Sequence, residues 1–475
     1  MHDDRQLTIL LKDWFGVKEL RLPGLYLVGG TVRDTLMNCP PKDLDLVCRN
    51  AKEFASVIAR HKKAALVPME KKPDEPCYRV VDRMKSDQFL DIAEMRGGTI
   101  YEDLLQRDFT INAIALELDE DGAVGRMLDP LNGALDLENK TIRTINDQSF
   151  VSDPLRVLRA VRFAAALGFS IEDQTWEGMK RNAALLRGVS AERVMTELML
   201  ILKSPGSGPS FRQMDSSGIL EVIFPEVAPM KGCPQNGYHH KDVWEHSLLV
   251  TENAEHILND LPHYFGESGS DVADNLKEDR LPLLKLSALL HDAGKPATRG
   301  LNPETGRITF YGHEKEGAKI IGDMAARMKL SNRNREFLVL LAAEHLHVLV
   351  LASGRTKATT KMRWFRKMRD DAVPAIILSM ADVMSSLGPE SGEEYRSRHI
   401  DWAKKGIHEY YDCIKAKLET PGLINGDDLI GLGMEPGPEI GKVLARVRTG
   451  QDTGEISSHE QALELARSLI GQKSL

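Results

Sequence analysis

The hydrophobic pattern of this 475-residue chain changes near Asp153. Before that point, short apolar or β-branched runs alternate with Gly, Pro and Asp, as in GLYLVGG, KDLDLVC, CYRVV and QFLDIA, which is typical of strands mixed with short helices. After it, apolar residues recur at the spacing of an amphipathic helix, beginning with Leu155, Leu158 and Val161. We therefore predict an α+β protein with a strand-containing first part and a helical remainder.

Breaks in the pattern predict how the chain divides. Residues 204–210 (SPGSGPS) and 232–240 (GCPQNGYHH) concentrate Gly, Pro, Ser and Asn and are predicted to be linkers, and the hydrophilic run 266–280 is predicted to be a loop. The predicted parts are a mixed head over residues 1–145, a helical neck over 146–232, a second helical domain over 233–390 and a helical tail over 391–475.

Composition limits the class of protein. Five scattered cysteines without a CxxC pair predict neither a disulfide framework nor a thiolate zinc site. The N-terminus lacks a secretory signal pattern, and the most apolar stretch, 337–352, is too short and too often interrupted by polar residues to span a membrane. We expect a soluble, cytoplasmic protein with no membrane partner, and its oligomeric state stays open.

The run LYLVGGTVRDTLMNCPPKDLDLV (25–47) carries the first candidate site. A predicted strand ends at Gly29 and Gly30, and glycines between a strand and a helix let backbone N–H groups approach a phosphate closely. Asp43 and Asp45 follow two positions apart in a strand, so both carboxylates point to one face. Such a pair favours Mg²⁺, which prefers oxygen ligands. The alternative is an acidic pair on a solvated strand edge.

A third carboxylate is expected from a neighbouring strand. In QFLDIAE, Asp91 lies between apolar residues and is the preferred candidate, with Glu94 second, although either could be an ordinary surface acid. Together these acids predict a catalytic centre in which two Mg²⁺ ions neutralise the attacking and leaving oxygens of a phosphoryl transfer.

An arginine stripe follows Asp153. Asp153 and Pro154 are predicted to start a helix as its N-cap and first residue. Arg156, Arg159 and Arg162 then recur every three positions with no acid between them. A solvated face more often mixes both signs, so the stripe predicts an anionic partner, and the planar fork of Arg suits a phosphate or a base edge.

Five motifs occur in order: GGTVRD (29–34), DLD (43–45), RDFTINAIA (107–115), DPLRVLRAVRFAAALGF (153–169) and ER (192–193). Over about residues 20–230 they resemble the class II tRNA nucleotidyltransferase and bacterial poly(A) polymerase family. The resemblance implies a head similar to the polymerase β nucleotidyltransferase fold and, as substrates, CTP, ATP and the 3′ end of tRNA.

The resemblance also implies residue roles. Asp153 and Arg156 match the pair that reads the Watson–Crick edge of the incoming nucleotide, an Asp accepting from an exocyclic amine and an Arg donating to ring or carbonyl acceptors. The sequence departs from the family at Ser152, where Glu is common. Without the resemblance, Asn112 reads as a buried polar residue. The other nucleotide-binding candidates are Gly29, Gly30, Arg33, Asp34, Arg107, Asp108, Asn112, Arg159 and Arg162.

The second helical domain holds histidines and acids in apolar helical contexts. One such histidine is usually a satisfied core residue, but this set predicts a metal site because imidazole and carboxylate together bind divalent transition metals. Its arrangement around HDAGK resembles the HD-domain metal-dependent phosphohydrolases, which implies Ni²⁺, Mn²⁺ or a similar ion, or Mg²⁺; a remnant with ligands but little activity is the alternative. The candidate ligands are His246, His291, Asp292, His313, His345 and Asp382.

Residues 361–369 (KMRWFRKMR) combine five basic residues with Trp364 and Phe365. This mixture suits phosphate contact and base stacking, although an amphipathic helix burying both aromatics explains the same letters. The net charge of −8 does not exclude RNA, because affinity depends on local basic surface. The RNA-binding candidates are Arg355, Lys357, Lys361, Arg363, Arg366, Lys367 and Arg369.

The leading hypothesis is a template-independent enzyme that adds all or part of CCA to tRNA and releases pyrophosphate. Full CCA-adding members of the resembled family often carry a longer flexible segment before RDFTINA. The short run 91–106 resembles members restricted to A or CC addition, and also poly(A) polymerases, whose basic C-terminal extension is not evident. The alternatives are an HD phosphohydrolase or cyclic phosphodiesterase with a nucleotide-sensing head, and an RNA-binding protein with both sites inactive.

Overall fold

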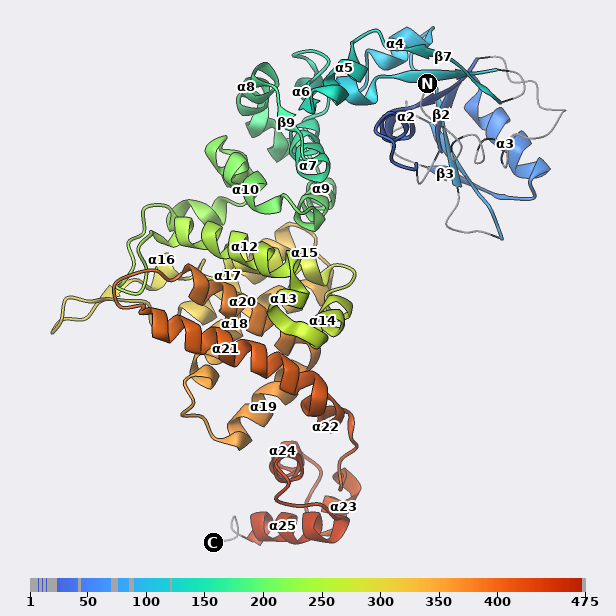
Figure 1. The fold of residues 1–475 in the computed structure, drawn as a ribbon. Coiled ribbons are helices and arrows are strands. Elements are labelled where there is room, and N and C mark those ends of the chain that lie inside the picture. Colours follow the sequence, from blue (N-terminus) through green and yellow to red (C-terminus); the bar gives the residue numbers. More distant parts are fainter. Residues whose placement is uncertain are drawn as a thin grey trace. The chain divides into compact units, whose positions relative to one another are not determined.

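The computed structural model describes residues 7, 11, 14, 24–41, 44–69, 76–84, 89–119 and 122–471 (Figure 1). The chain forms two compact units, one of Met1–Glu197 with Ser216–Val222 and one of Leu198–Asp215 with Ile223–Leu475. The predicted α+β class is confirmed, because a mixed head precedes a helical remainder. Among the described residues, no helix combines the length and apolarity that crossing a membrane requires.

The first unit is built on a seven-stranded sheet of order β3-β4-β5-β2-β1-β6-β7. Neighbouring strands are antiparallel except β2 and β5, which run parallel with Asp45 opposite Asp91. Register partners point their side chains to the same face, so the sheet brings these two acids together. The strands are β1 (Leu25–Val28), β2 (Leu44–Cys48), β3 (Ala65–Met69), β4 (Cys77–Val81), β5 (Phe89–Glu94), β6 (Ala115–Leu118) and β7 (Val124–Leu128).

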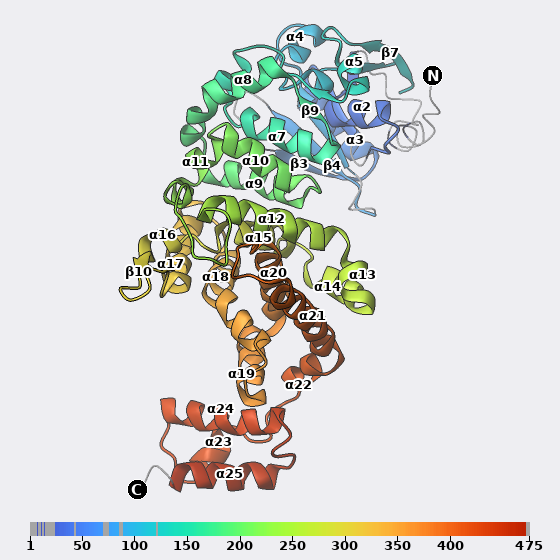
Figure 2. The same cartoon turned by 60° about the vertical axis from the view of Figure 1, so that its left-hand side comes forward.

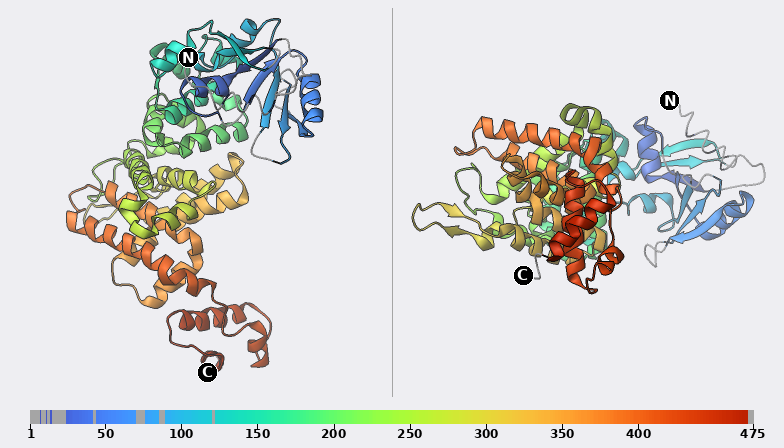
Figure 3. Two further views of the ribbon diagram at one scale, coloured as in Figure 1. Left: turned by 45° about the vertical axis from the view of Figure 1, so that its right-hand side comes forward. Right: turned by 90° about the horizontal axis from the view of Figure 1, so that it is seen from below.

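Short helices fix the edges and ends of this sheet. Helix α3 packs on β3, β4 and β5, as Figure 3 shows in blue. Val28 of β1, Val47 of β2 and Leu104 of α4 share one apolar cluster. The helices are α2 (Gly29–Leu36), α3 (Ala51–His61), α4 (Ile100–Leu104), η1 (Thr110–Asn112) and α5 (Gly133–Glu138).

Four α-helices and a 3-10 helix continue from the sheet. The helix predicted to start at Asp153 begins later, at Arg156. A turn precedes it, in which the Arg156 amide donates to the Asp153 carbonyl at 3.0 Å. Strands β8 (Thr141–Ile142) and β9 (Ser170–Ile171) pair beside this helix. The elements are α6 (Ser149–Ser152), α7 (Arg156–Leu167), α8 (Asp173–Asn182), η2 (Ala183–Gly188) and α9 (Ala191–Lys203).

The second unit is helical apart from the hairpin of β10 (Gly300–Leu301) and β11 (Ile308–Thr309). Helix α20 lies at its centre, contacting α12, α15, α18 and α21 (Figure 2). Its sequence AVPAIILSMADVMS is apolar nearly all round, as a helix surrounded by others requires. The main helices are α12 (Val243–Asn259), α15 (Arg280–Leu290), α17 (His313–Arg327), α18 (Asn332–Ala352), α20 (Ala372–Ser385) and α21 (Glu393–Glu409).

The linker predicted over 204–210 is partly wrong, because helix α10 (Ser207–Ser216) begins inside it. Buried Glu255 accepts hydrogen bonds from the Ser207 and Gly208 amides at 3.0 and 2.9 Å. Buried Lys285 donates to Glu255 at 2.8 Å and to the Ser204 carbonyl at 3.1 Å. A carboxylate from another helix therefore caps α10, which the local sequence could not indicate.

The loop predicted over 266–280 is also wrong, because it contains η4 (Gly266–Ser268) and α14 (Gly269–Asn275). Val272 and Leu276 are buried, so two apolar residues at helical spacing stabilise this hydrophilic run. The predicted linker 232–240 has only turns, bends and irregular backbone.

The C-terminal helices form a small cluster of their own, in which α24 packs on α25 (Figure 2). They are α23 (Gly426–Gly431), α24 (Pro438–Asp452) and α25 (His459–Gly471), and α22 (Lys415–Glu419), which precedes them, contacts the π-helix η6 (Tyr410–Ile414) instead. The remaining elements are α11 (Ile219–Ile223), η3 (Pro225–Met230), α13 (Leu261–Phe265), α16 (Lys295–Thr298), α19 (Ala358–Met368) and η5 (Arg369–Asp371).

Candidate functional site

The Asp45 carboxylate lies against the start of α2. A Cβ added to Gly29 or to Gly30 would lie 3.4 Å from Asp45 Oδ2, and Gly29 has a φ of +62°. The Asp45 amide donates to the Thr31 hydroxyl at 2.7 Å. The left-handed backbone at Gly29 favours glycine, whereas a Cβ at Gly30 would make only an ordinary contact with Asp45. The predicted approach of these N–H groups to a phosphate stays a prediction. Asp43, the other half of the predicted pair, lies outside the described residues.

Asp91 is beside Asp45 in the sheet and is bound by an arginine. Arg79 of β4 donates to both Asp91 oxygens, at 2.7 and 2.8 Å, and its guanidinium lies 3.7 Å from the centre of the Phe89 ring. Glu94, the second candidate, instead accepts the Asn50 and Ala51 amides at 2.8 Å each. Asp45 and Asp91 thus offer the oxygen donors that Mg²⁺ prefers, whereas Glu94 holds the start of α3.

A chain of polar contacts joins three predicted nucleotide-binding motifs. Arg33 donates to the Asn112 side chain at 3.0 Å, Asn112 donates to Asp108 at 3.0 Å, and Arg159 donates to Asp108 at 2.9 Å. Asn112 and Asp108 are buried. Burial alone would raise the pKa of Asp108, but the Arg159 charge and the Asn112 hydrogen bond hold it down to about 2. Asp108 is therefore an anchor for Arg159.

Phe163 and Glu197 complete this arginine cluster. The guanidinium carbons of Arg33, Arg159 and Arg162 lie 5.2, 5.5 and 4.1 Å from the Phe163 ring centre. Buried Glu197 of α9 accepts from Arg162 at 2.6 Å and pairs with Arg159 at 3.5 Å. The sequence prediction missed both residues; a single acid on the apolar face of α9 was the available signal. The cluster carries three cations around one aromatic ring, which suits an anionic ligand.

The predicted base-reading pair is held by different neighbours. Arg156 donates to the Ser149 hydroxyl and to the Gln106 carbonyl, both at 2.7 Å, so its direct acceptors are uncharged. Asp153 pairs with Arg193 at 3.1 Å, which links the last two motifs. Arg107 binds Asp103 at 2.8 Å, and Asp34 accepts from Arg33 at 2.8 Å.

At Ser152, where the family commonly has Glu, the side chain forms a hydrogen bond to the backbone near its own position. Its hydroxyl donates to the Ser149 carbonyl at 3.0 Å, within its own short helix α6. Ser149 is also the residue whose hydroxyl accepts from Arg156. Ser149 therefore provides the support for Arg156 that a Glu could otherwise supply.

In the second unit, three histidines are oriented by their own segments. The Nδ1 atoms of His291, His313 and His345 lie 2.9, 2.8 and 2.7 Å from the carbonyl oxygens of Ala288, Phe310 and Ala342, each three residues earlier. Since a carbonyl only accepts, each Nδ1 carries the proton and each Nε2 presents a lone pair. Metal-binding histidines commonly have this support.

Those lone pairs converge on Asp292. Its Oδ2 lies 3.1 Å from His291 Nε2, and its Oδ1 lies 3.4 Å from His313 Nε2 and 3.9 Å from His345 Nε2. Nearby, His246 Nε2 lies 3.0 Å from Asp382 Oδ1. Two groups could each hold an ion, namely His246, His291 and Asp382, and Asp292, His313 and His345. His291 Nε2 is buried without a hydrogen-bond partner, which fits a metal site. The structure thus brings all six predicted ligands together.

A cavity of about 780 Å³ opens over the cluster and reaches Asp292, His313, His345 and Asp382. It also reaches two residues that the sequence did not single out. Lys295 of HDAGK binds Asp292 Oδ2 at 2.7 Å, and the His239 ring centre lies 4.4 Å from that of His246. Burial lowers the pKa of His239 to about 2, so it is neutral. His239 lies in the predicted linker 232–240, where only the adjacent His-His pair was a signal.

Three family models match consecutive parts of the chain. They are described as the poly A polymerase head domain (residues 25–143), the probable RNA and SrmB-binding site of polymerase A (168–231) and the HD domain (243–387). An A-adding tRNA nucleotidyltransferase of Deinococcus radiodurans is 29% identical over 93% of this chain and 94% of its own length. A CC-adding tRNA nucleotidyltransferase of Thermus thermophilus is 30% identical over 92% of this chain and 91% of its own.

The chain belongs to the tRNA nucleotidyltransferase and poly(A) polymerase family. The resemblance read from the five motifs is therefore confirmed. A solved structure of the Thermotoga maritima CCA-adding enzyme complexed with tRNA covers 99% of this chain and 96% of its own, with a TM-score of 0.62 at 24% identity. A CCA-adding enzyme solved with ATP gives a TM-score of 0.65 at 24% identity over 99% of this chain and 96% of its own, so both show a shared fold.

In this member of the family, the basic segment 361–369 is mostly helix α19. Trp364 and Phe365 are buried, and the Trp364 indole donates to Glu344 at 3.1 Å. Arg366 binds Asp452 at 2.6 Å, and Lys367 also binds Glu344. The two aromatics pack as in the amphipathic-helix alternative and are not placed to stack on bases, so the RNA-binding prediction rests on the cations alone.

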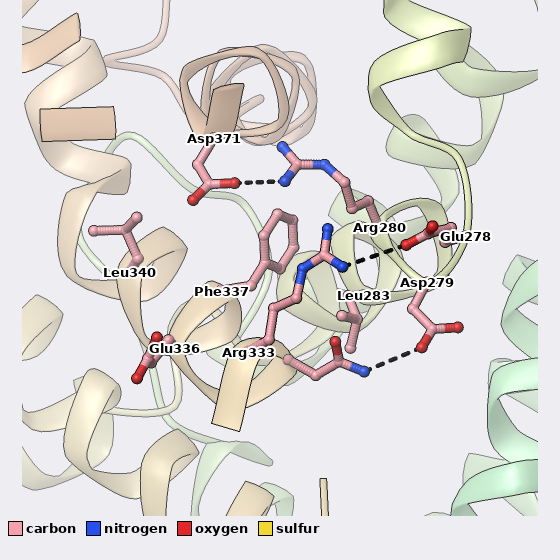
Figure 4. A pocket seen from close by; sticks show the side chains of 10 residues that line it. Glu278, Asp279, Arg280, Leu283, Arg333, Glu336, Phe337, Leu340 and Asp371 are labelled. Carbon is pink, nitrogen blue, oxygen red and sulfur yellow. Dashed lines mark hydrogen bonds and ion pairs between the residues drawn. The ribbon is translucent and has the colours of Figure 1, made fainter. Parts of the chain in front are cut away.

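The second unit also has a smaller pocket of about 260 Å³ (Figure 4). Its charged residues are largely paired with one another. Arg280 binds Asp371 at 2.7 Å, Arg333 binds Glu278 at 3.4 Å, and the Asn334 amide donates to Asp279. Since these pairs leave little unbalanced charge and none of the six metal-ligand candidates lines it, we assign the chemistry to the other two sites.

Proposed function

We propose that this chain adds part of the 3′-terminal CCA of tRNA, either CC or A, from CTP or ATP. One observation carries the proposal: a Cβ on Gly30 would lie 3.4 Å from Asp45 Oδ2 and 3.6 Å from Arg33 Nη2. The candidate metal carboxylate and the first arginine of the nucleotide cluster therefore flank the same glycine. Phosphoryl transfer is favoured where metal-binding oxygens and cations that bind phosphate lie close to one another.

In the proposed reaction, the 3′ oxygen of the RNA forms a bond to the α-phosphorus of the nucleotide. The bond from that phosphorus to the bridging oxygen breaks, and pyrophosphate leaves with the electron pair. Asp45, Asp91 and the predicted Asp43 would hold Mg²⁺, which when bound neutralises charge on the reacting oxygens. Arg33, Arg159 and Arg162 would bind the triphosphate, leaving the base to Asp153 and Arg156.

The restriction to partial addition follows from the segment before RDFTINA. Thr99 and Glu102 form a reciprocal capping box at the start of α4, and the Arg96 amide donates to Asp103 at 3.1 Å. Asp103 also binds Arg107. A short segment held at both ends has little freedom to re-form the base site, so we expect one kind of nucleotide to be accepted, C or A.

The decisive experiment supplies tRNA transcripts ending before CCA, after C and after CC, with CTP and ATP singly and together. Addition of CC only, or of A only, supports the proposal, and complete CCA on the first transcript contradicts the restriction. The Asp43→Ala/Asp45→Ala double variant should lose incorporation while keeping its circular dichroism spectrum. Glu53→Gln, an exposed acid on α3, is the matched control and should retain activity.

A second candidate function, metal-dependent phosphoester hydrolysis, is favoured by the three lone pairs that converge on Asp292. We propose Ni²⁺, Mn²⁺ or a similar ion, or Mg²⁺, at the two ligand groups. Hydrolysis would form a bond from a water oxygen to phosphorus and break the bond to the ribose oxygen, which takes up a proton. Hydrolysis of 2′,3′-cyclic or terminal nucleotide phosphates with each ion, and its loss in His291→Ala, tests this site independently of the head.

The predicted four-part division at residues 145, 232 and 390 and the cytoplasmic location belong to the same proposal. The three matching family models support the division, since their ends at 143, 231 and 387 fall within three residues of the predicted boundaries. No disulfide joins the five cysteines, all of which are in the described part of the chain, and this supports a reducing compartment.

A further inference from the structure

Three neighbouring strands of the head place an arginine in line with two candidate metal ligands. Arg79 of β4 is the register partner of Asp91 of β5, and Asp91 is the register partner of Asp45 of β2. Neighbouring strands are about 5 Å apart, and residues directly opposite one another point to the same face of a sheet. The sheet therefore carries a row of one cation and two acids on the face of the predicted Mg²⁺ site.

The Arg79 guanidinium is held on two sides. It donates to both Asp91 oxygens, at 2.7 and 2.8 Å, and its carbon lies 3.7 Å from the centre of the Phe89 ring. Phe89 and Asp91 are two positions apart on β5, so both side chains lie on the same face as Arg79. The side chains of Arg79 and Asp91 are only 29% and 13% exposed. This bidentate pair is therefore fixed and shielded from water, unlike a typical surface ion pair.

The ion pair neutralises one of two like charges on this face. Carboxylates on neighbouring strands repel one another, and Asp45 is itself partly buried. A carboxylate has about four lone-pair sites, of which the fork of Arg79 uses one on each oxygen. Each Asp91 oxygen keeps a further lone pair, so the arginine and a metal ion can use the same carboxylate.

We propose that Arg79 is the built-in counter-ion of the Mg²⁺ site in the head: it neutralises Asp91 when no metal is bound, and it lowers the affinity of the site for Mg²⁺. This inference rests on the metal site of the proposed transferase. Arg79 acts through Asp91 and is a positioning residue. A fixed positive charge weakens the binding of a divalent cation beside it, whereas the same charge lets β2 and β5 stay paired without metal.

The first test measures Mg²⁺ binding at the head of the full chain without nucleotide or RNA. Fe²⁺ bound in place of Mg²⁺ cleaves the nearby backbone when ascorbate and peroxide are added. Mass spectrometry separates fragments cut near Asp45 or Asp91 from those cut at the HD cluster. In Arg79→Met, the Mg²⁺ concentration that halves cleavage in the head should fall about tenfold. Arg79→Lys keeps the charge, so its value should stay near that of the wild type.

Arg83→Met is the matched control, because Arg83 is an exposed arginine just after β4, and it should keep the wild-type value. Head cleavage with an unchanged or higher Mg²⁺ requirement in Arg79→Met would overturn the inference and leave the proposed metal site intact. Absence of head cleavage from the wild type would contradict the metal site itself and the inference with it.

A second measurement begins without metal. Hydrogen exchange, followed by mass spectrometry, is compared in peptides that cover β2 and β5 of the full chain in EDTA. These peptides should exchange faster in Arg79→Met than in the wild type, and added Mg²⁺ should restore the wild-type rate because the ion replaces the missing charge. Equal exchange in EDTA, or fast exchange that Mg²⁺ does not reverse, would show that Arg79 is not the counter-ion of this site.

Discussion

In the HD cluster, His291, His313 and His345 each donate an Nδ1 proton to a carbonyl three residues earlier, so each ligand is oriented within its own turn of chain. In the nucleotide site, Arg159 is instead oriented by Asp108, which lies 51 residues away in sequence. The histidines of the HD cluster are each oriented locally, whereas the contact that orients Arg159 in the nucleotide site depends on tertiary packing.

This difference predicts how each site responds to the loss of one side chain. Loss of one locally oriented histidine leaves the others in place, because none of the three supports another through Nδ1. Loss of Asp108 releases Arg159 and Asn112 together, and Asn112 in turn supports Arg33. Both ligand groups of the HD cluster should therefore be weakened together only by a change at the shared ligand Asp292, whereas the nucleotide site should fail at its buried anchor Asp108.

The largest effect is expected at that shared ligand. Asp292 belongs to one ligand group, 3.4 Å from His313, and also lies 3.1 Å from His291 of the other group. Asp292→Asn should therefore reduce bound Mn²⁺ or Ni²⁺ from about two ions per chain to below one. Elemental analysis after dialysis measures this, and nucleotide incorporation should be unchanged. Asp323→Asn, an exposed acid on α17, should keep the full metal content. Full occupancy in Asp292→Asn would show that the ligands do not share this carboxylate.

The next effect is expected at the buried anchor of the head. Asp108→Asn leaves Arg159 without its closest charge partner, and we expect a loss of about 2 kcal/mol in unfolding free energy, moderated because Arg159 is one-third exposed. The KM for nucleotide should also rise. Urea denaturation followed by a head-specific probe measures the first quantity. Asp147→Asn, an exposed neighbour in the same unit, should change neither.

The same carboxylate predicts a pH dependence. The pKa of Asp108 is about 2 in the folded chain and near 3.8 otherwise, so its stabilisation is complete above pH 4 and is lost as the pH falls through 2. The stability difference between wild type and Asp108→Asn should therefore shrink by up to about 2 kcal/mol between pH 5 and pH 2. A difference that is constant over this range would contradict the depressed pKa.

The smallest effect is expected at the GG turn. Gly29→Ala should cost about 1 kcal/mol for a left-handed backbone, and its Cβ would lie 3.3 Å from Arg107 Nη1 and 3.4 Å from Asp45 Oδ2. Gly168→Ala has the same backbone problem at φ +68° with nothing within 4 Å. Both variants should lose similar stability, but only Gly29→Ala should lower incorporation, by a few-fold. Equal incorporation by Gly29→Ala and Gly168→Ala would show that the turn at Gly29 does not contribute to the metal site.

The local construction of the HD cluster explains why all six of its ligands were predictable from sequence: each lies in a recognisable helical motif. The strands β1, β2, β4 and β5 were also predictable, because each is a short apolar or β-branched run set off by Gly, Pro or Asp. Strand β3 was not, because Pro68 interrupts its pattern, and a proline is tolerated there since β3 is an edge strand.

Glu197, Phe163 and His239 were missed because their roles arise only when distant segments meet. The same is true of α10, which is capped by Glu255 from another helix. The candidate chemical groups lie in sequence motifs, whereas several of the groups that hold them in place do not.

The cap on α10 also determines where this chain can be divided. A fragment beginning at residue 233 would remove the Ser204 carbonyl and the Ser207 hydroxyl from buried Lys285, leaving it with Glu255 alone. A fragment beginning near residue 198 keeps these contacts, in agreement with the inclusion of Leu198–Asp215 in the second unit. Expression of the helical half as an independent protein, or its exchange between relatives, therefore requires a junction upstream of α10.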